Sequence, residues 1–518
     1  MKSYVTAAVV LILLLVAAPW GIGKLAEKRV NSGLDELVKT APYLSIVERK
    51  WQRGWFTSEQ EVTFEVLGPW LRALSPKTAT EGAGNAPAAL PPAPGESQPE
   101  EPAETPVDEV AGAGSPDTTA GETPSAEPPA AAIGPIKFTV RNHILHGPVL
   151  WFSALGIARV DSQLVLPETV RAELTKLFGE ESPLQISTRV RFFGGGTTTL
   201  SGGARELKFA GQRASVSYDA FKVKLGYSAH FDDFDVDGDW PRFEINNVED
   251  DDARQASYRF EGMTATGTSH RVRGDLYEGD FKLAVDETHF VGPDQGVVEV
   301  AGLHYIVDTT IDDDFMDVAV KFGTGAAKSK VFDELGLKVE GIHYDFTVRR
   351  LHLDTLVKMV AAIKASYARP VATAADIDAA ISQPMKEYGL ELLKHDPEFV
   401  IDRFGGSSSE GDMYLKGIIK LKGVTGEDLA VGAMGLIGKL DADITFTMAQ
   451  QLAAKVPNGA AGLATAMDQG YAKLEGKNVV SHIEFRNGAL KINGKEQGIP
   501  GLGAPNGGLP PGPAPQPE

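Results

Sequence analysis

Short runs of alternating apolar and polar residues between Leu184 and Val348 constrain the fold of this chain more than any other feature. Examples are residues 186–192, 215–225 and 281–285, and Gly, Asp and Asn separate the runs. Successive side chains of a β-strand point to opposite faces of its sheet, so this period of two predicts half-buried strands. Closely spaced turn residues predict antiparallel neighbours. The sequence therefore predicts an antiparallel β-meander.

A short unit recurs within this stretch. Residues 258–263, 298–305 and 337–344 each contain a glycine at the equivalent place, and these glycines, Gly262, Gly302 and Gly341, are 40 and 39 residues apart. Such spacing suits a repeated pair of hairpins that stack edge to edge. We therefore predict that the meander forms one long, curved sheet.

Helical periodicity replaces the alternation over residues 353–393, and strands return within residues 399–446. A last hairpin is predicted to turn on Asn487-Gly488, which suits a type I′ turn. The predicted fold class is mainly β with some α. It is an extended antiparallel β-meander or curved sheet with helices packed on it, preceded by one N-terminal transmembrane helix.

Residues 4–20, YVTAAVVLILLLVAAPW, are predicted to cross a membrane once. Their length is close to the minimum for a spanning helix and long for the apolar core of a cleaved signal. Ala17 and Ala18 could precede a cleavage site, but Pro19 just beyond it disfavours cleavage. An uncleaved anchor is therefore favoured, and basic residues on both sides leave its orientation open. An amphipathic helical continuation is expected over residues 24–39.

Residues 76–133 contain ten acidic residues against a single lysine, Lys77, and almost no large apolar side chains. Such a segment is predicted to be disordered. Alternating runs at 61–66 and 136–140 flank it and are expected to pair, which makes the insertion a loop within a domain. The predicted organisation is a transmembrane anchor (1–22), a juxtamembrane helix with the first strands (23–75), a disordered insertion (76–133), a β-meander (134–350), a mixed helix and strand region (351–496) and a disordered tail (497–518).

The composition excludes several kinds of function. The net charge of −20 argues against a nucleic-acid partner. The absence of cysteine excludes disulfides, thiolate metal sites and a cysteine nucleophile. The sequence also lacks the G-x-S-x-G, H-E-x-x-H, phosphate-loop and dinucleotide motifs, so nothing supports catalysis and no catalytic residue is predicted.

Residues 233–244 match the spacing of a calcium-binding loop, with Gly238 at the sharp turn. The context disagrees, because an EF-hand has a helix on each side, whereas residues 216–230 alternate like a strand. Pro241 also occupies the ninth place. The alternative is an acidic, solvated turn between strands, so no cofactor is expected unless calcium binds here. The candidate calcium ligands are Asp233, Asp235, Asp237, Asp239 and Glu244.

Several short motifs, in this order along the chain, resemble the YdgA-like family of bacterial proteins, whose domain has no known function. This resemblance implies an uncleaved anchor in the bacterial inner membrane, with the bulk of the chain in the periplasm. It brings no activity and no site residues with it. The motifs follow the anchor and are Gly23 to Lys28, Arg53 to Ser58, His146-Gly147-Pro148, Glu391 to Gly411 and Gly488 to Gly494.

Two classes of function are compatible with these observations. The first is a non-enzymatic envelope protein that binds a lipid or a partner protein on a long sheet held at the inner membrane by residues 4–20. This arrangement resembles the AsmA-like envelope proteins, whose curved sheets cradle lipid. The second is a periplasmic enzyme with calcium as a structural ion. An apolar trough along the sheet would favour lipid binding.

Overall fold

A computed structural model describes most of the chain apart from the predicted insertion and tail. For residues 2–20 it describes the helical backbone but not the side chains. The predicted disorder of 76–133, and of the tail beyond residue 498, lies outside the described part. The described residues are 2–67, 136–147, 149–150, 154–165, 175, 184–208, 213–248, 255–292, 296–367, 369, 374–455 and 458–498.

The chain begins with a long helix and continues mainly as strands. The strands are β1 (Leu44–Arg53), β2 (Thr57–Val66), β3 (Ile136–His146), β4 (Val149–Leu150), β5 (Ala154–Leu155), β6 (Ala158–Val165), β7 (Gln185–Val190), β8 (Gly196–Gly202), β9 (Arg205–Lys208), β10 (Arg213–Tyr218), β11 (Phe221–Tyr227), β12 (Asp233–Val248), β13 (Gln255–Arg273), β14 (Leu276–Gly292), β15 (Gly296–Asp312), β16 (Phe315–Thr324), β17 (Ala327–Lys328), β18 (Val339–His352), β19 (Glu398–Ser408), β20 (Gly411–Leu421), β21 (Leu440–Ala449), β22 (Lys473–Glu475), β23 (Asn478–Arg486), β24 (Ala489–Ile492) and β25 (Lys495–Gln497). The helices are α1 (Lys2–Thr40), α4 (Lys330–Glu334), α5 (Leu353–Tyr367), α6 (Ala374–Leu393), α7 (Gly426–Val431), α8 (Ala433–Ile437), α9 (Gln450–Lys455) and α10 (Gly459–Asp468), with a 3-10 turn, η1 (Ala229–Phe231).

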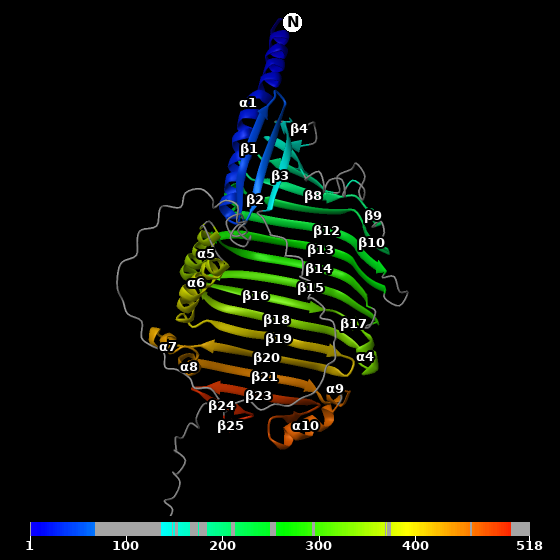
Figure 1. Cartoon of the computed structure of the whole chain (residues 1–518), viewed down its shortest axis with the longest axis vertical. Helices are drawn as coiled ribbons and strands as arrows, with labels where there is room; N and C mark the ends of the chain where they lie inside the picture. Colours follow the sequence, from blue (N-terminus) through cyan, green and yellow to red (C-terminus); the bar gives the residue numbers. More distant parts are fainter. Residues whose placement is uncertain are drawn as a thin grey trace, which may run out of the picture.

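All but two of these strands form one antiparallel sheet of 23 strands in a meander, as predicted. Neighbours in sequence are mostly neighbours in the sheet, and β10 and β11 lie end to end beside β12. Figure 1 shows the strands stacked across the long axis of the molecule. β2 pairs with β3 from Thr57–Leu145 to Val66–Ile136. The insertion therefore connects two adjacent strands, as the flanking alternation predicted.

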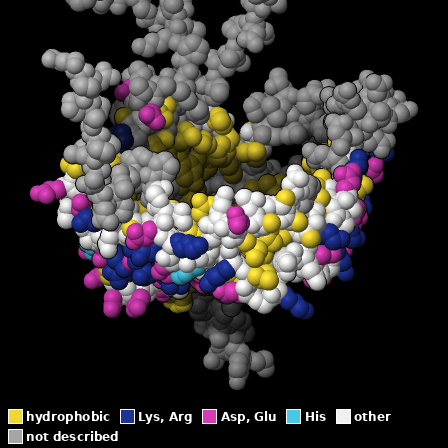
Figure 2. Space-filling model, turned by 90° about the horizontal axis from the view of Figure 1, so that it is seen from below, with side chains coloured by type: hydrophobic (Ala, Val, Ile, Leu, Met, Phe, Trp, Pro, Cys, Tyr) yellow, Lys and Arg dark blue, Asp and Glu magenta, His cyan; other side chains and the backbone are white. Residues whose placement is uncertain are grey.

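The two faces of the sheet differ in chemistry. One face presents an apolar side chain on strand after strand, whereas the other presents ion pairs such as Lys224–Asp237 and Lys420–Glu398. Figure 2, a view along the long axis, shows a hollow lined by hydrophobic side chains, with charged side chains on the outer surface. We call this hollow the trough. One row of its apolar face runs through Leu283, Tyr305, Phe322, Tyr344, Phe404, Leu415 and Phe446.

The recurring glycines lie on a line across the sheet. Within a strand, either the odd-numbered or the even-numbered residues point to the apolar face on one side of this line, and the other set does so on the opposite side. In β15, Val298 and Val300 share the apolar face with residues of opposite parity, Leu303 and Tyr305, on the other side of Gly302. The backbone of Gly302 has φ +62°, a conformation that glycine adopts without strain. The predicted repeat therefore places a bend in successive strands, and bends of this kind curve a sheet. Gly302 lies opposite Gly325, and the register places Gly262 and Gly341 on the same line.

Helices cover parts of the apolar face. The second half of α1 packs on the first strands, where Ala26 contacts a buried core that includes Ile144 and Val160. Farther along, α5 and α6 close one end of the middle strands with a second core of Leu276, Leu353, Leu356 and Leu392. Figure 1 shows the start of α1 extending beyond the sheet.

None of the helices in the described part of the chain is both apolar enough and long enough to cross a membrane. The predicted anchor, residues 4–20, forms the start of α1. Its side chains lie outside the described residues, so the anchor stays a prediction.

Candidate functional site

The predicted calcium ligands lie on a strand rather than in a loop. Residues 233–248 form β12. The predicted calcium-loop conformation is therefore wrong, and so is the alternative prediction of a solvated turn. Alternate residues of a strand lie roughly 6.6 Å apart, so successive carboxylates spread along the outer face instead of surrounding one point. Calcium binding itself stays a prediction, without the loop on which it was based. The residues concerned are Asp233, Asp235, Asp237, Asp239 and Glu244.

Several of these carboxylates have partners on the outer face. Asp237 accepts a hydrogen bond from Lys224 at 2.9 Å. The hydrogen bond between the His270 ring and Asp233, 2.6 Å long, lowers the pKa of Asp233 and raises the pKa of His270. Burial alone would raise the pKa of Glu244, but hydrogen bonds from Asn246 and Arg242 lower it. The strand therefore belongs to an ion-pair network.

The described residues also bring Asp443, His482 and Glu484 together, with potential ligand atoms within 4.8 Å of one another. His482 and Asp443 are hydrogen bonded at 2.8 Å on the outer face of β21 and β23. Arg486 lies 3.4 Å from Asp443 and 3.8 Å from Glu484, so both carboxylates also belong to an ion-pair network.

The trough extends over many neighbouring strands of the sheet. At the paired positions of the described strands β14 to β24, its apolar face carries no charged side chain. Large apolar side chains on this face keep between 37% and 42% of their surface exposed, and together they form the kind of exposed apolar patch that is informative on a protein surface. They are Tyr258, Phe281, Tyr305, Phe322, Tyr344, Phe399, Phe404 and Met413.

Three of the motifs that carry the family resemblance meet where α1 joins the sheet. Gly23 of α1 packs on the ring of His146, since a Cβ atom at Gly23 would lie 2.6 Å from the His146 ring. His146 Nδ1 donates to the carbonyl of Trp55 at 3.2 Å, and His146 Nε2 forms a 2.9 Å hydrogen bond with the hydroxyl of Ser58. Ser58 is 2% exposed, so this hydrogen bond is buried. This Ser–His pair positions α1.

Buried polar side chains continue the attachment of α1. Gln60 donates to Asn31 of α1 at 3.0 Å, Asn142 donates to Gln60 at 2.9 Å, and Ser162 donates to Asn142 at 2.7 Å. Arg53 forms an ion pair with Glu27 of α1. Buried polar groups cost stability unless they are paired, so this chain of hydrogen bonds specifies where α1 sits on the sheet.

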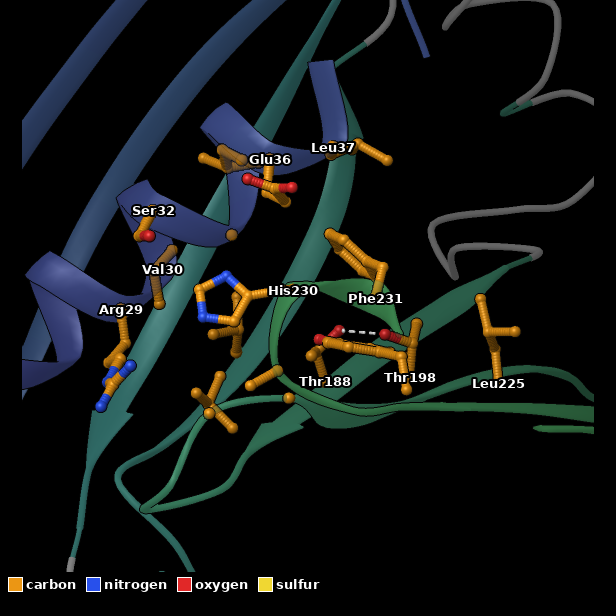
Figure 3. Close-up of a pocket in the computed structure, with 18 of the residues that line it drawn as sticks. Arg29, Val30, Ser32, Glu36, Leu37, Thr188, Thr198, Leu225, His230 and Phe231 are labelled. Carbon is orange, nitrogen blue, oxygen red and sulfur yellow. Dashed lines mark hydrogen bonds between the residues drawn. The ribbon is translucent and has the colours of Figure 1, made fainter. Parts of the chain in front are cut away.

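A cavity of about 350 Å³ lies between α1 and the sheet. Figure 3 shows Val30 and Leu37 on α1, Leu225 on the sheet, and His230 and Phe231 on the η1 turn between them. A hydrogen bond of 2.9 Å joins Thr188 and Thr198 on the floor. The size of the cavity and its mainly apolar lining are typical of a ligand pocket.

The patterns in the sequence predict neither this cavity nor the Ser58–His146 pair. The cavity is lined from α1, the η1 turn and six strands, so no local pattern identifies it. Alternation could have assigned Thr188, Thr198 and Leu225 to the apolar face, but not the helix that covers them.

No curated protein and no solved structure matches the chain. Residues 1–499 match the family described as "Bacterial protein of unknown function (DUF945)". Because this match covers nearly the whole sequence, the chain belongs to that bacterial family, to which no molecular function is assigned.

Proposed function

We infer that this protein is a non-enzymatic protein of the bacterial envelope that binds the hydrocarbon chains of membrane lipids in its trough. In this proposal residues 4–20 anchor it in the inner membrane, with the bulk in the periplasm. The observation that carries the proposal is the apolar face of β14 to β24, which has no charged side chain at its paired, described positions.

The rings on this face remain accessible. Tyr305, Phe322 and Tyr344 lie side by side on neighbouring strands, and the Phe322 and Tyr344 rings are 5.9 Å apart. Burying apolar surface yields roughly 25 cal/mol per Å², so each ring would gain from a hydrocarbon partner. Large exposed apolar patches mark binding surfaces.

The rows of apolar side chains are long enough to hold a lipid chain. From β14 to β23 a row crosses eight paired strands, and neighbouring strands lie about 4.8 Å apart, which gives roughly 34 Å. One acyl chain spans about half of the ~30 Å hydrocarbon core of a bilayer. A lipid could therefore lie along a row with its headgroup in solvent. A protein partner would normally find polar groups as well.

The test is the lipid content of full-length protein purified in mild detergent, measured by mass spectrometry of its extract. Phe322→Asp places a charge on the apolar face. Thr266→Asp places the same charge on the outer face of β13, where Thr266 lies opposite Lys282. We expect phospholipid with the wild type and Thr266→Asp, and its loss in Phe322→Asp.

Wild-type protein that carries no phospholipid would contradict the lipid proposal. If a partner protein were instead crosslinked to residues of the trough, the trough would be a binding site for that protein. The anchor is tested separately. A mature chain that begins beyond Ala18 and is released by high salt would contradict the anchor, and labelling of the sheet from the cytosolic side would contradict the periplasmic location.

A further inference from the structure

The covered cavity is part of the same apolar face as the open trough. Thr198 and Leu225 face the cavity from β8 and β11, and Leu225 pairs with Val236 of β12. Val30 and Leu37 of α1 form its roof. The cavity is thus the α1 end of the trough, covered on one side by a helix.

Polar contacts attach α1 along its β1 and β2 side. Arg49 donates to Asp35 at 2.7 Å, and Arg53 pairs with Glu27. The side of α1 that faces the cavity carries the apolar residues Val30, Leu34 and Leu37, with the charged residues Arg29 and Glu36 beside them. Helix α1 therefore covers the cavity, and these polar contacts attach it to the sheet along one side, the side of β1 and β2.

An aromatic partition separates the cavity from the rest of the trough. The Phe231 ring lies 5.2 Å from the ring of Tyr227 and 5.6 Å from that of Phe234, which lies 5.7 Å from Tyr277. Phe231 lines the cavity, whereas Phe234 and Tyr277 line the adjoining groove. Phe231 therefore lies at the border between the two spaces.

The turn that holds Phe231 is strained. His230 has φ +62° and Phe231 has φ +58°, conformations that residues with a Cβ rarely adopt. The Tyr277 hydroxyl donates to the Phe231 carbonyl at 3.0 Å and holds the turn in place. Strained backbone supported in this way often belongs to a functional element.

The cavity lies close to the predicted membrane. Val30 follows Trp20 by ten residues and Leu37 by seventeen, which corresponds to about 15–25 Å along a helix that rises ~1.5 Å per residue. The helix that would enter the membrane is therefore the helix that roofs the cavity. A hydrocarbon chain leaving the bilayer beside α1 would meet the cavity before the open part of the trough.

We propose that the cavity under α1 is the loading site of the trough, where one hydrocarbon chain of a membrane lipid enters and passes Phe231 into the open part. This inference rests on the proposed function. It adds an entry route for the lipid chain, through the cavity, and a gate, the ring of Phe231. No bond is made or broken in the step.

The test compares loading rate with final occupancy. Full-length protein is reconstituted in vesicles of phosphatidylethanolamine and phosphatidylglycerol that carry a pyrene-labelled acyl chain. Loss of pyrene excimer fluorescence reports chains that leave the bilayer. Occupancy is measured independently by supplying the same lipid from detergent and extracting the protein.

Two variants fill the cavity from opposite sides. Thr198→Phe fills it from the sheet, and Thr199→Phe adds the same ring to the outer face of β8 as a control. Gly33→Phe fills it from α1, where a Cβ meets nothing within 4 Å, and Gly21→Phe is the matching control. We expect both filled variants to load about tenfold more slowly, with unchanged occupancy from detergent, and both controls to load at the wild-type rate. Phe231→Ala should load faster.

Loading of both filled variants at the wild-type rate would overturn the route while leaving the lipid-binding trough intact. Slower loading of Phe231→Ala would overturn the gate. Wild-type protein that holds no lipid from either source would overturn the proposed function itself.

Discussion

The two ends of the trough share one apolar pattern but differ in what covers it. Under α1, Ile144 is 0% exposed and belongs to a compact core. On β16, Phe322 occupies the same face of the same sheet and keeps 40% of its surface exposed. A sheet needs a cover for an apolar face, and α1 supplies it at one end. Among the described residues no helix lies over Phe322 in this way, and we propose that lipid covers the open end.

The largest expected effect compares truncation at the two ends. Ile144→Ala removes buried methyl groups beneath α1 and should lower the free energy of unfolding by about 2–5 kcal/mol. Phe322→Ala should lower it by about 1 kcal/mol or less in lipid-free protein, because the ring is already exposed. Denaturant unfolding measures both. Equal losses would show that the open end is packed like the covered end.

The second prediction concerns how closely α1 approaches the sheet. Gly21→Ala should stabilise the protein by up to about 1 kcal/mol, since alanine favours a helix and its Cβ meets nothing within 4 Å. Gly23→Ala makes the same change two residues later, but its Cβ would meet the His146 ring and should cost about 1–3 kcal/mol. Thermal unfolding of the two variants should therefore shift in opposite directions. Equal shifts would mean that α1 is not seated on His146.

The third prediction tests the bend that makes the open end hollow. Gly302→Ala introduces a Cβ at φ +62° and should cost about 1–2 kcal/mol. At Gly238 a Cβ would meet Val223 and Ala265 at ordinary contact distances, so Gly238→Ala should be neutral or slightly stabilising. Unfolding in urea distinguishes them. A neutral Gly302→Ala would show that the glycine line does not shape the trough.

The strands were predictable because the alternation of apolar and polar residues lies within each strand's own sequence. Alternation identified the meander and the pairing of β2 with β3, and the repeat located Gly262, Gly302 and Gly341 on alternate strands. The bend at these glycines was not predicted, since it depends on register across several strands. A hairpin repeat and a line of bends leave the same spacing in a sequence.

The calcium pattern failed as a loop for a related reason. Carboxylates at alternate positions satisfy the first half of a calcium loop, and they equally satisfy the outer face of a strand. Phe234 and Val236 between them supply the apolar face of β12, so the period of two was the better guide. The cavity and the Ser58–His146 pair could not be predicted, because they join segments far apart in the chain.

The smallest expected effect concerns α6, which covers the rim of the open end. The rings of His395, just beyond α6, and His352, at the end of β18, stack 3.7 Å apart. Burial, and then the charge of His352, lower the pKa of His395 below its ordinary value of about 6.5. The folded protein therefore binds fewer protons here than the unfolded chain.

This sign predicts that stability rises as pH increases through the window between the lowered pKa of His395 and about 6.5. Burial lowers the pKa of His343 in the same direction, whereas Asp233 raises that of exposed His270 and acts in the opposite direction. Carboxylates such as Glu391, whose pKa Lys394 lowers, titrate at more acidic pH. His395→Phe keeps a stacked ring without the charge, so its melting temperature should depend less on pH between about 5 and 7. An unchanged slope would mean that α6 covers the rim without any contribution from the stacked histidines.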